Sequence, residues 1–479
     1  MEQPSVERKF RFDHELNSHW TVDNNPLRFP NARNYKDLRI RDNLKIITID
    51  IRRDVFKNCL TPSLNSLVDV LQRNTKYPIC LTISWEAVAF TKRKDVAPPS
   101  PPWREPIGPL ICPNSIELLK PYINILIDNI HRWKALRIFS PIITRMEPEF
   151  SRIPAGGAPS LQSLILMDVE HYDEIKDLFP ILLSIREYSK NFRELLFFDN
   201  RNRACGSRIP DPFCLSLSRH FPFMPYDWLT SLRLDYKLSA ADALAMLNRG
   251  SRLVECVFSS LTGATLLPDG IRLATCSSLH YLKLSNYEGD FANYKSTGTL
   301  YSLLKNISTP NLKRLVLQYE DQWDMDAFAI FITQSSCNLD ELHIIKMGID
   351  AEGLVACLEL AGDSLIELLL EERTRLGLTR HFIKHLAYED PRRHDRNRAC
   401  LCPNLQVVSI GDFSLDGSGN FGRALSSRIG VTPLEKVKIL ATDILRNGEN
   451  IPERDIKGFE ELKRQGIDVY LVRDPCDGL

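Results

Sequence analysis

The segment 310–363 contains one pattern written twice, and this internal repeat constrains the fold more than any other feature. The first copy reads PNLKRLVLQYEDQWDMDAFAIFITQSS and the second reads CNLDELHIIKMGIDAEGLVACLELAGD. Apolar residues alternate at the start of each copy, which predicts a strand with one buried edge. An acidic residue suited to capping, Asp326 or Asp350, then precedes apolar residues at helical spacing. Each unit is therefore a strand and an amphipathic helix, which bury their apolar faces by stacking on similar units.

The strand pattern of this repeat recurs along most of the chain. The middle apolar residue of each candidate strand serves as its marker, and the markers are Leu164, Leu195, Leu232, Cys256, Leu282, Leu315, Leu342, Leu368, Val408 and Val437. Successive markers are separated by 24 residues (Leu232 to Cys256) to 40 residues (Leu368 to Val408). A constant strand with variable spacing predicts an α/β solenoid, with a curved parallel sheet on the concave side and irregular helices and loops on the convex side.

The pattern divides the chain into an arm, a solenoid and a short tail. Residues 1–43 are polar and interrupted by Pro26 and Pro30, so we expect a weakly structured N-terminal arm. The solenoid is predicted over residues 44–472, ending in a helix and a strand, and residues 473–479 form a C-terminal tail. Residues 91–113 are rich in proline, which excludes helix and predicts a surface insertion loop. Docking of this loop on an aromatic groove of a partner is the alternative.

Charge and cysteine usage exclude several classes of protein. The chain has 61 basic and 61 acidic residues, so it lacks the positive field that a dedicated nucleic-acid or anionic-lipid binder requires. Its 12 cysteines are dispersed, as around Cys256 and Cys357, and none forms a CxxC pair, which indicates buried thiols in a reducing compartment. The chain has neither an apolar run of about 18 residues nor the apolar core of a signal peptide. The expected location is therefore cytoplasmic or nuclear, away from membranes.

Tandem LxxLxL strands resemble the leucine-rich-repeat family, and their long, irregular spacing resembles that of F-box proteins. Further phrases resemble the large F-box and leucine-rich-repeat families of mushroom-forming fungi. These phrases are RNTKYPICLTISW (73–85), IHRWKALRIFSP (130–141), CPNLQVVSI (402–410) and FEELKRQGIDVYL (459–471). The resemblance covers roughly residues 44–472.

This resemblance implies a leucine-rich-repeat solenoid that recognises substrates for an F-box-type (SCF) ubiquitin ligase. In such ligases the F-box, of the form LPxEIL followed by an apolar helix, binds a Skp-type adaptor and through it a cullin. Residues 1–43 contain no such phrase, so either the F-box has been lost or the chain starts downstream of it. We expect non-enzymatic recognition of a protein. A leucine-rich-repeat remnant without a ligase partner is one alternative, and the partner's identity and the oligomeric state stay open.

A glycine motif supports another alternative, a nucleotide-binding protein or enzyme. Gly417, Gly419 and Gly422 satisfy GxGxxG and precede a plausible helix. However, the motif does not directly follow a strand, and the next strand arrives within about 20 residues, whereas a nucleotide-binding unit needs about 30. A convex loop explains these glycines better, and no cofactor is expected.

Neither a metal site nor a catalytic site is predicted. His381 and His385 have the helical spacing of a zinc pair, yet the glutamate of HExxH is absent and the nearby cysteines form a CxC pair. Cys402 instead occupies the place of Ala158 and Thr309 at the start of a repeat. The basic run RRHDRNR (392–398) is typical of a solvated loop. Because GxSxG, P-loop and triad spacings are all absent, no catalytic residue is assigned.

Strand geometry places any binding site on the concave face. In LxxLxL strands the leucines face the core and the alternate residues point outward from the sheet. The outward positions, which also include Val316, mix charge with aromatic and apolar surface, and this suits a protein partner. Plain solvated surface is the alternative. The candidate partner-binding residues are Arg233, Asp235, Tyr281, Lys283, Arg314, Gln318, Glu341, His343, Glu367 and Glu371.

Overall fold

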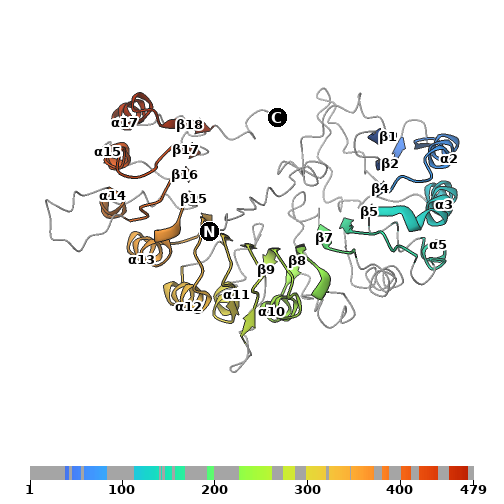
Figure 1. The fold of residues 1–479 in the computed structure, drawn as a ribbon, viewed down its shortest axis with the longest axis horizontal. Helices are drawn as coiled ribbons and strands as arrows, with labels where there is room; N and C mark the ends of the chain where they lie inside the picture. The colour runs from blue at the N-terminus through green and yellow to red at the C-terminus, as the bar shows by residue number, and fades with distance from the viewer. Residues whose placement is uncertain are drawn as a thin grey trace, which may run out of the picture.

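The computed structural model describes the chain in segments that together form one curved sheet with helices on its outer side. The described residues are 38–41, 46–54, 59–83, 113–139, 142, 146–153, 157–167, 191–198, 226–261, 273–285, 298–319, 323–345, 347–371, 380–387, 401–411, 420–440 and 453–472. Their strands form a 16-stranded sheet that lines the inside of an arc (Figure 1). The predicted α/β leucine-rich-repeat solenoid is therefore confirmed.

Beyond its N-terminal end the sheet is parallel, and its strands follow one another in chain order. The strands of this sheet are β1 (Leu38–Arg41), β2 (Ile46–Asp54), β3 (Cys59–Thr61), β4 (Ile79–Ile83), β5 (Trp133–Phe139), β6 (Ser163–Met167), β7 (Glu194–Phe198), β8 (Ser231–Leu238), β9 (Glu255–Leu261), β11 (Tyr281–Ser285), β13 (Arg314–Gln318), β14 (Glu341–Ile345), β15 (Glu367–Glu371), β16 (Val407–Gly411), β17 (Lys436–Leu440) and β18 (Asp468–Val472). A separate parallel pair consists of β10 (Ala274–Thr275) and β12 (Ile307–Ser308). Chain order and strand order coincide because each repeat stacks directly on the previous one.

The register of the sheet aligns the repeat markers across neighbouring strands. Leu315 of β13 is paired with Leu282 of β11 on one side and with Leu342 of β14 on the other. Every predicted marker from Leu164 to Val437 is paired with the next marker of the series. The row continues to Ile49, Leu81 and Leu136 at one end and to Val469 at the other. All of these side chains are buried, so the row forms the centre of the core.

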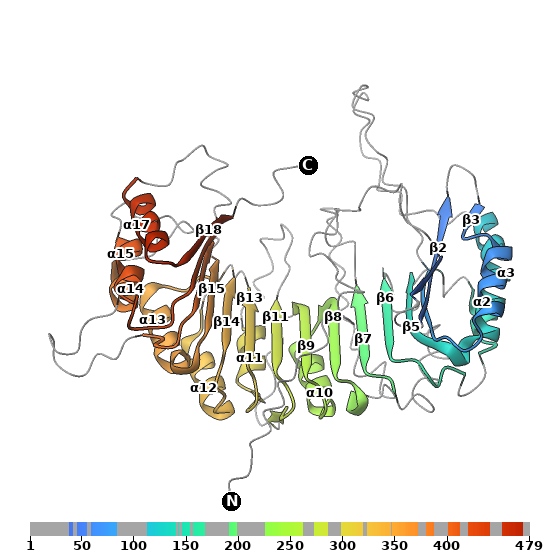
Figure 2. The ribbon, with the colours of Figure 1, turned by 45° about the horizontal axis from the view of Figure 1, so that its top comes forward.

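Helices cover the outer side of the sheet, one after another along the arc (Figure 1 and Figure 2). The described helices are α2 (Leu64–Arg73), α3 (Pro113–Asp128), α5 (Glu147–Phe150), α10 (Ala240–Arg249), α11 (Thr299–Leu304), α12 (Met325–Ser335), α13 (Ala351–Ala361), α14 (Arg380–Leu386), α15 (Asn420–Ser426) and α17 (Glu453–Arg464), with short 3₁₀ turns at Ile130–Arg132, Tyr226–Trp228 and Gly362–Ser364. In α12, Phe328, Phe331 and Ile332 are buried, as the helical spacing predicted. Leu354 and Leu358 of α13 are buried in the same way.

Side-chain caps determine where the helices of the duplicated segment begin. Asp350 accepts a hydrogen bond from the backbone nitrogen of Gly353 at 2.7 Å, which confirms the predicted cap of α13. At α12 the prediction is wrong, because the cap is Asp324, which accepts from the backbone nitrogen of Ala327 at 2.9 Å. Asp326 lies in the first turn, where a negative charge complements the helix dipole.

A short turn leads into each strand and explains the recurrent PNL phrase. The backbone nitrogen of Leu312 donates to the carbonyl of Thr309 at 3.0 Å, and the same bond joins Leu405 to Cys402 at 3.2 Å. The side chain of Asn404, within one such phrase, donates to a backbone carbonyl of the preceding repeat at 2.7 Å. Cys402 is buried, so its predicted role as the first residue of a repeat is confirmed.

The structure shifts one predicted domain boundary. Four residues of the predicted arm, Leu38–Arg41, form β1, which pairs antiparallel with β2, so the sheet begins before residue 44. Helix α3 begins at Pro113, the last residue of the predicted insertion, where proline costs the helix no hydrogen bond. The rest of the arm, residues 91–112 of the insertion and the tail 473–479 lie outside the described residues.

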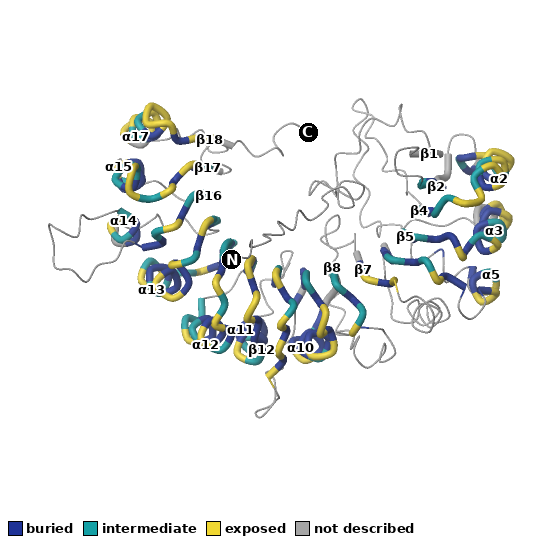
Figure 3. The backbone as a smooth tube through the Cα atoms, in the orientation of Figure 1, coloured by how far each residue is buried: buried dark blue, intermediate teal, exposed yellow. Residues whose placement is uncertain are grey.

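Burial alternates along the strands, as expected for a sheet with helices on one face (Figure 3). In β15, Leu368 and Leu370 are buried, whereas Glu367, Leu369 and Glu371 are only half-buried. The thiols of Cys256 and Cys357 lie in the core, as predicted. None of the helices in the described part of the chain is long and apolar enough to cross a membrane.

Candidate polar site on the concave face

The inner side of the arc presents rows of side chains that cross the strands. The first inner row directly precedes the markers, the second inner row directly follows them, and the third inner row lies three residues after them. Parallel pairing in register places the members of a row side by side, about 4.8 Å apart. Of the predicted residues, Tyr281, Arg314, Glu341 and Glu367 belong to the first row, Arg233, Lys283 and His343 to the second, and Asp235, Gln318 and Glu371 to the third.

A polar strip runs over β9 to β15 in the first and second inner rows. We define the polar strip as Glu255, Tyr281, Arg314, Glu341, His343 and Glu367. At its centre, the Arg314 guanidinium carbon lies 5.0 Å from the centroid of the Tyr281 ring, and Arg314 Nε lies 2.8 Å from Glu341 Oε2. One arginine thus contacts an aromatic ring and a carboxylate on its two neighbouring strands. These two contacts restrict the orientation of a side chain that is still 44% exposed.

At the C-terminal end of the strip, two carboxylates share one imidazole. Glu341 and Glu367 are paired in register on β14 and β15 and therefore stand side by side. His343 Nε2 lies 4.0 Å from Glu341 Oε2 and 3.6 Å from Glu367 Oε1. The pKa of the Glu367 carboxyl is lowered, chiefly by the neighbouring His343 ring, while burial opposes this effect. The Glu367 carboxylate is therefore stabilised in its ionised form.

The other end of the strip is a less favourable environment for a carboxylate. The pKa of Glu255 is raised, first by burial and next by the negative charge of Glu194, while Arg233 and Arg314 oppose the rise. The pKa of the Tyr281 hydroxyl is also raised, mainly by burial. Glu255 and Glu367 thus differ in the direction of their pKa shifts although they occupy the same row.

The remaining predicted residues lie on the inner face outside the strip. Arg233, Asp235, Lys283, Gln318 and Glu371 are all half-buried there. Val316 points to the same side but is only 4% exposed, because it lies between Lys283 and His343 in its row. The expectation that Val316 adds open apolar surface is therefore wrong.

Sequence reasoning missed two features of this face. Glu255 directly precedes the marker Cys256, so the alternation that identified Tyr281 would also have identified it. The second feature lies at the C-terminal end of the sheet, where Lys436 Nζ lies 4.8 Å from the centroid of the Tyr470 ring. The β17–β18 register pairs Tyr470 with Lys438 rather than with Lys436, so this diagonal contact depends on the side-chain conformations and has no signal in the sequence.

The glycine motif is partly explained by helix packing. Gly422 lies in α15, and a Cβ added there would come within 2.8 Å of the Cα of Gly458 in α17. Gly422 therefore allows two helices to approach closely, which requires no nucleotide. Gly417 and Gly419 lie outside the described residues, so the nucleotide-binding alternative stays a prediction. His381 and His385 both lie in α14, and the basic run 392–398 also falls outside the described residues.

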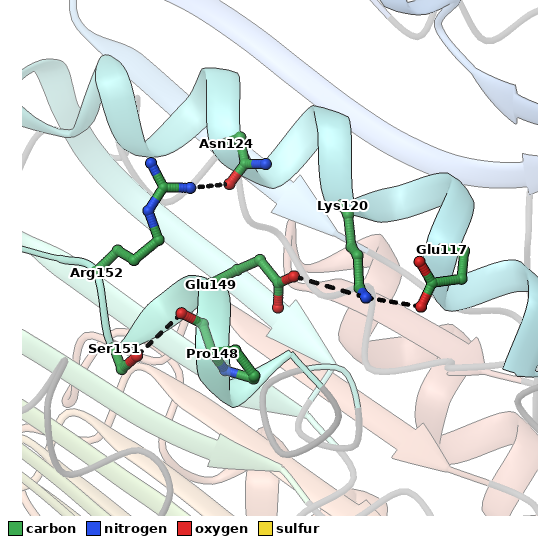
Figure 4. Close-up of polar contacts among 7 residues, drawn as sticks. All are labelled: Glu117, Lys120, Asn124, Pro148, Glu149, Ser151 and Arg152. Carbon is green, nitrogen blue, oxygen red and sulfur yellow. Dashed lines mark hydrogen bonds and ion pairs between the residues drawn. The ribbon is translucent and has the colours of Figure 1, made fainter.

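A second polar cluster lies on the outer side of the arc, where α5 packs near α3 (Figure 4). Lys120 pairs with Glu117 of its own helix at 2.7 Å and lies 3.9 Å from Glu149 of α5. Arg152 donates a hydrogen bond to Asn124 at 2.6 Å. These contacts join α3 to the segment around α5, so a structural role accounts for this cluster.

Comparison with known proteins does not assign the chain to a family. No protein-family model matches the sequence, and no curated protein matches it. Among solved structures, the chain is similar to the leucine-rich repeat-containing protein LegL7 from Legionella pneumophila, with 16% sequence identity and a TM-score of 0.33. That alignment covers 67% of this chain and 85% of the other chain.

Proposed function

We propose that the chain is a non-enzymatic recognition protein that binds a protein partner through the polar strip. The arrangement of Arg314 supports this proposal, because Tyr281 and Glu341 orient its guanidinium before any partner arrives. Arginine and tyrosine are among the residues that contribute most to protein interfaces. A side chain that is already oriented also loses less conformational entropy on binding.

The charge pattern favours a protein over a nucleic acid as the partner. The strip and its neighbours combine Glu255, Glu341 and Glu367 with Arg314 and with Lys438 of β17, so both signs of charge are present between β9 and β17. Nucleic acid requires a predominantly basic surface, and the chain as a whole has no excess of basic residues. A mixed surface instead matches the polar rim and aromatic–arginine centre of a protein interface.

We further propose that the bound protein is a substrate of an F-box-type (SCF) ubiquitin ligase, with a Skp-type adaptor and a cullin as the other partners. The resemblance of segments 73–85, 130–141, 402–410 and 459–471 to fungal F-box and leucine-rich-repeat proteins supports this role. A cytoplasmic or nuclear location accords with the free thiols of Cys80, Cys256, Cys276, Cys337, Cys357 and Cys402. A recognition solenoid without a ligase remains the alternative.

A pull-down of the tagged full-length chain from its own cell extract tests both parts of this proposal. Stoichiometric capture of a Skp-type adaptor and a cullin together with other proteins would support ligase membership. Capture of other proteins without an adaptor or cullin would contradict ligase membership and leave recognition intact. Absence of any stoichiometric protein would contradict recognition itself.

A charge exchange within the strip then tests the site. The double variant Arg314→Glu with Glu341→Arg keeps the net charge but reverses the pattern that a partner contacts. We expect the captured partner to decrease by at least about tenfold, because like charges placed together across an interface cost several kcal/mol. The fold should persist, since an exposed ion pair contributes only about 0.2–1 kcal/mol.

The matched control exchanges an exposed ion pair far from the strip. Glu453 and Lys457 are paired at 2.8 Å on α17, and both side chains are mostly exposed. The control variant Glu453→Lys with Lys457→Glu should capture the partner as the natural chain does. Equal capture by the strip variant and the natural chain would refute the strip as the binding site.

A further inference from the structure

Three metal-binding side chains converge at the C-terminal end of the polar strip. Glu341 and His343 are two residues apart on β14, so they point to the same side of the sheet, and Glu367 is the register partner of Glu341 on β15. One ligand atom from each residue lies within 4.8 Å of the others. The repeat architecture itself creates this group, because it aligns the two carboxylates on adjacent strands.

The ring of His343 is buried, and one of its nitrogen atoms lacks a hydrogen-bond partner among the described residues. Only 9% of its side chain is exposed, and its Nε2 atom has no hydrogen-bond partner within the described part of the structure. The nearest carboxylate oxygens, at 3.6 Å and 4.0 Å, are too distant for hydrogen bonds. A buried nitrogen that faces two carboxylates without bonding to either is unfavourable unless a water or a cation lies between them, and two carboxylates beside an imidazole favour a cation.

We propose that Glu341, His343 and Glu367 form a binding site for a divalent transition-metal ion, with zinc the best fit. Zinc binds imidazole nitrogen and carboxylate oxygen at about 2.0–2.2 Å, so two ligands of one tetrahedral ion lie roughly 3.3–3.5 Å apart. The distances of 3.6 Å and 4.0 Å from His343 to the two carboxylates therefore need to shorten by less than about 1 Å, and the two carboxylate oxygens, within 4.8 Å of each other, by less than about 1.5 Å. A neutral imidazole favours zinc over magnesium and calcium, which prefer oxygen ligands alone.

Neighbouring cations moderate the affinity of this site. Arg314 Nε already lies 2.8 Å from Glu341 Oε2. The positive charge of Lys438 also attracts the Glu367 carboxylate. A metal ion must share these carboxylates with both groups. Three protein ligands also leave one position of a tetrahedral ion open to water or to a side chain of a bound protein. The metal site does not depend on the proposed partner, because the ligands all come from this chain.

Isothermal titration of the full-length chain with Zn²⁺, with a reductant that does not bind zinc, tests the proposal. The natural chain should bind one zinc ion at this site. The variant His343→Gln should bind it at least about 100-fold more weakly, because even the loss of a residue that hydrogen-bonds to a metal ligand lowers metal affinity by about 10–100-fold. Glu367→Gln provides a second variant in case the first does not fold. Mg²⁺ should not compete. Zinc binding that is equal in the natural chain and both folded variants would overturn the proposal.

A histidine outside the cluster supplies the matched control. His280 is exposed, and its ring nitrogen contacts the backbone carbonyl of Ser278 at 2.7 Å. His280→Gln should bind zinc as the natural chain does. The variant Arg314→Gln, which removes a competing cation, should bind zinc up to about tenfold more tightly. Weaker zinc binding by Arg314→Gln would contradict the proposal that Arg314 competes with the metal ion for Glu341.

Cobalt(II) distinguishes this site from binding by the cysteines. Cobalt bound by one imidazole and two carboxylates gives only weak visible absorption, whereas thiolate ligands add an intense near-ultraviolet charge-transfer band. We expect a cobalt spectrum without the thiolate band, and we expect it to disappear in His343→Gln. A thiolate band that persists in His343→Gln would show that cysteines hold the metal and would refute the proposed site.

Discussion

The two halves of the concave face share one backbone register but display different side chains. In the second inner row, β6 and β7 present Ile165 and Leu196, which are 4% and 9% exposed. In the same row, β14 and β15 present His343, which lies between two carboxylates, and Leu369, which is half-buried. The markers behind these residues pair identically in both halves.

This difference shows that the residues that hold the strands together are not the residues that determine the character of the inner surface. The markers keep the strands together wherever they occur, so the inner positions are free to vary. At β6 and β7 the second-row positions, Ile165 and Leu196, are apolar and buried, and they add to the stability of the fold. At β13 to β15 they hold ion pairs and an oriented arginine, which cost stability to assemble and are useful for binding.

The largest expected effect comes from placing a charge in the apolar half. Ile165→Glu buries a carboxylate beside Arg137 of β5, which offsets only part of the cost of burial, and should lower the free energy of unfolding by about 2–3 kcal/mol. Leu369→Glu introduces the same charge in the same row at a half-buried position and should cost no more than about 1 kcal/mol. Urea unfolding followed by circular dichroism measures both. Equal losses would remove the distinction between the two halves.

A smaller effect is expected at Glu255, between the two halves. Its raised pKa means that the folded state binds the proton more tightly than the unfolded state does. Stability from this residue is therefore present below the unfolded pKa and declines as the pH rises through the window between the unfolded and the raised folded value. Glu255→Gln should thus be more stable than the natural chain at pH 7, by less than about 1 kcal/mol, and indistinguishable at low pH.

Urea unfolding at a series of pH values measures the Glu255→Gln difference. Glu435 is exposed, so Glu435→Gln serves as a control whose stability should follow that of the natural chain at every pH. If Glu255→Gln gained no stability between low and neutral pH, the unfavourable burial of this carboxyl would be disproved.

The smallest effect concerns the cation–π contact inside the strip. A double-mutant cycle with Arg314→Met and Tyr281→Leu should give a coupling energy of about 0.5–1 kcal/mol. The parallel cycle at Lys436 and Tyr470 should give about 0.5 kcal/mol or less, because Tyr470 is 46% exposed at the last strand. Thermal or urea unfolding measures both couplings. A larger coupling energy at Lys436 and Tyr470 than at Arg314 and Tyr281 would mean that burial does not strengthen the contact between Arg314 and Tyr281.

Local pattern alone predicted the repeat unit and its burial. Alternating leucines identify the strands from β6 to β17, and their alignment predicts the register in which Leu342 pairs with Leu368. Capping was predictable only in part. Asp350 and Asp326 are equally good caps by residue type, and it is the extended backbone at Asp324 that makes Asp324 the cap of α12.

The sequence by itself determined the solenoid, its concave face and most residues on that face, because strand alternation is a local property of the chain. The tertiary structure decided which of these side chains act together. The contacts of Arg314 with Tyr281 and Glu341, and the position of His343 beside Glu367, depend on rotamers and on neighbours 24–33 residues away in the adjacent repeats. Such contacts leave no periodic signal, because they arise between repeats rather than within one.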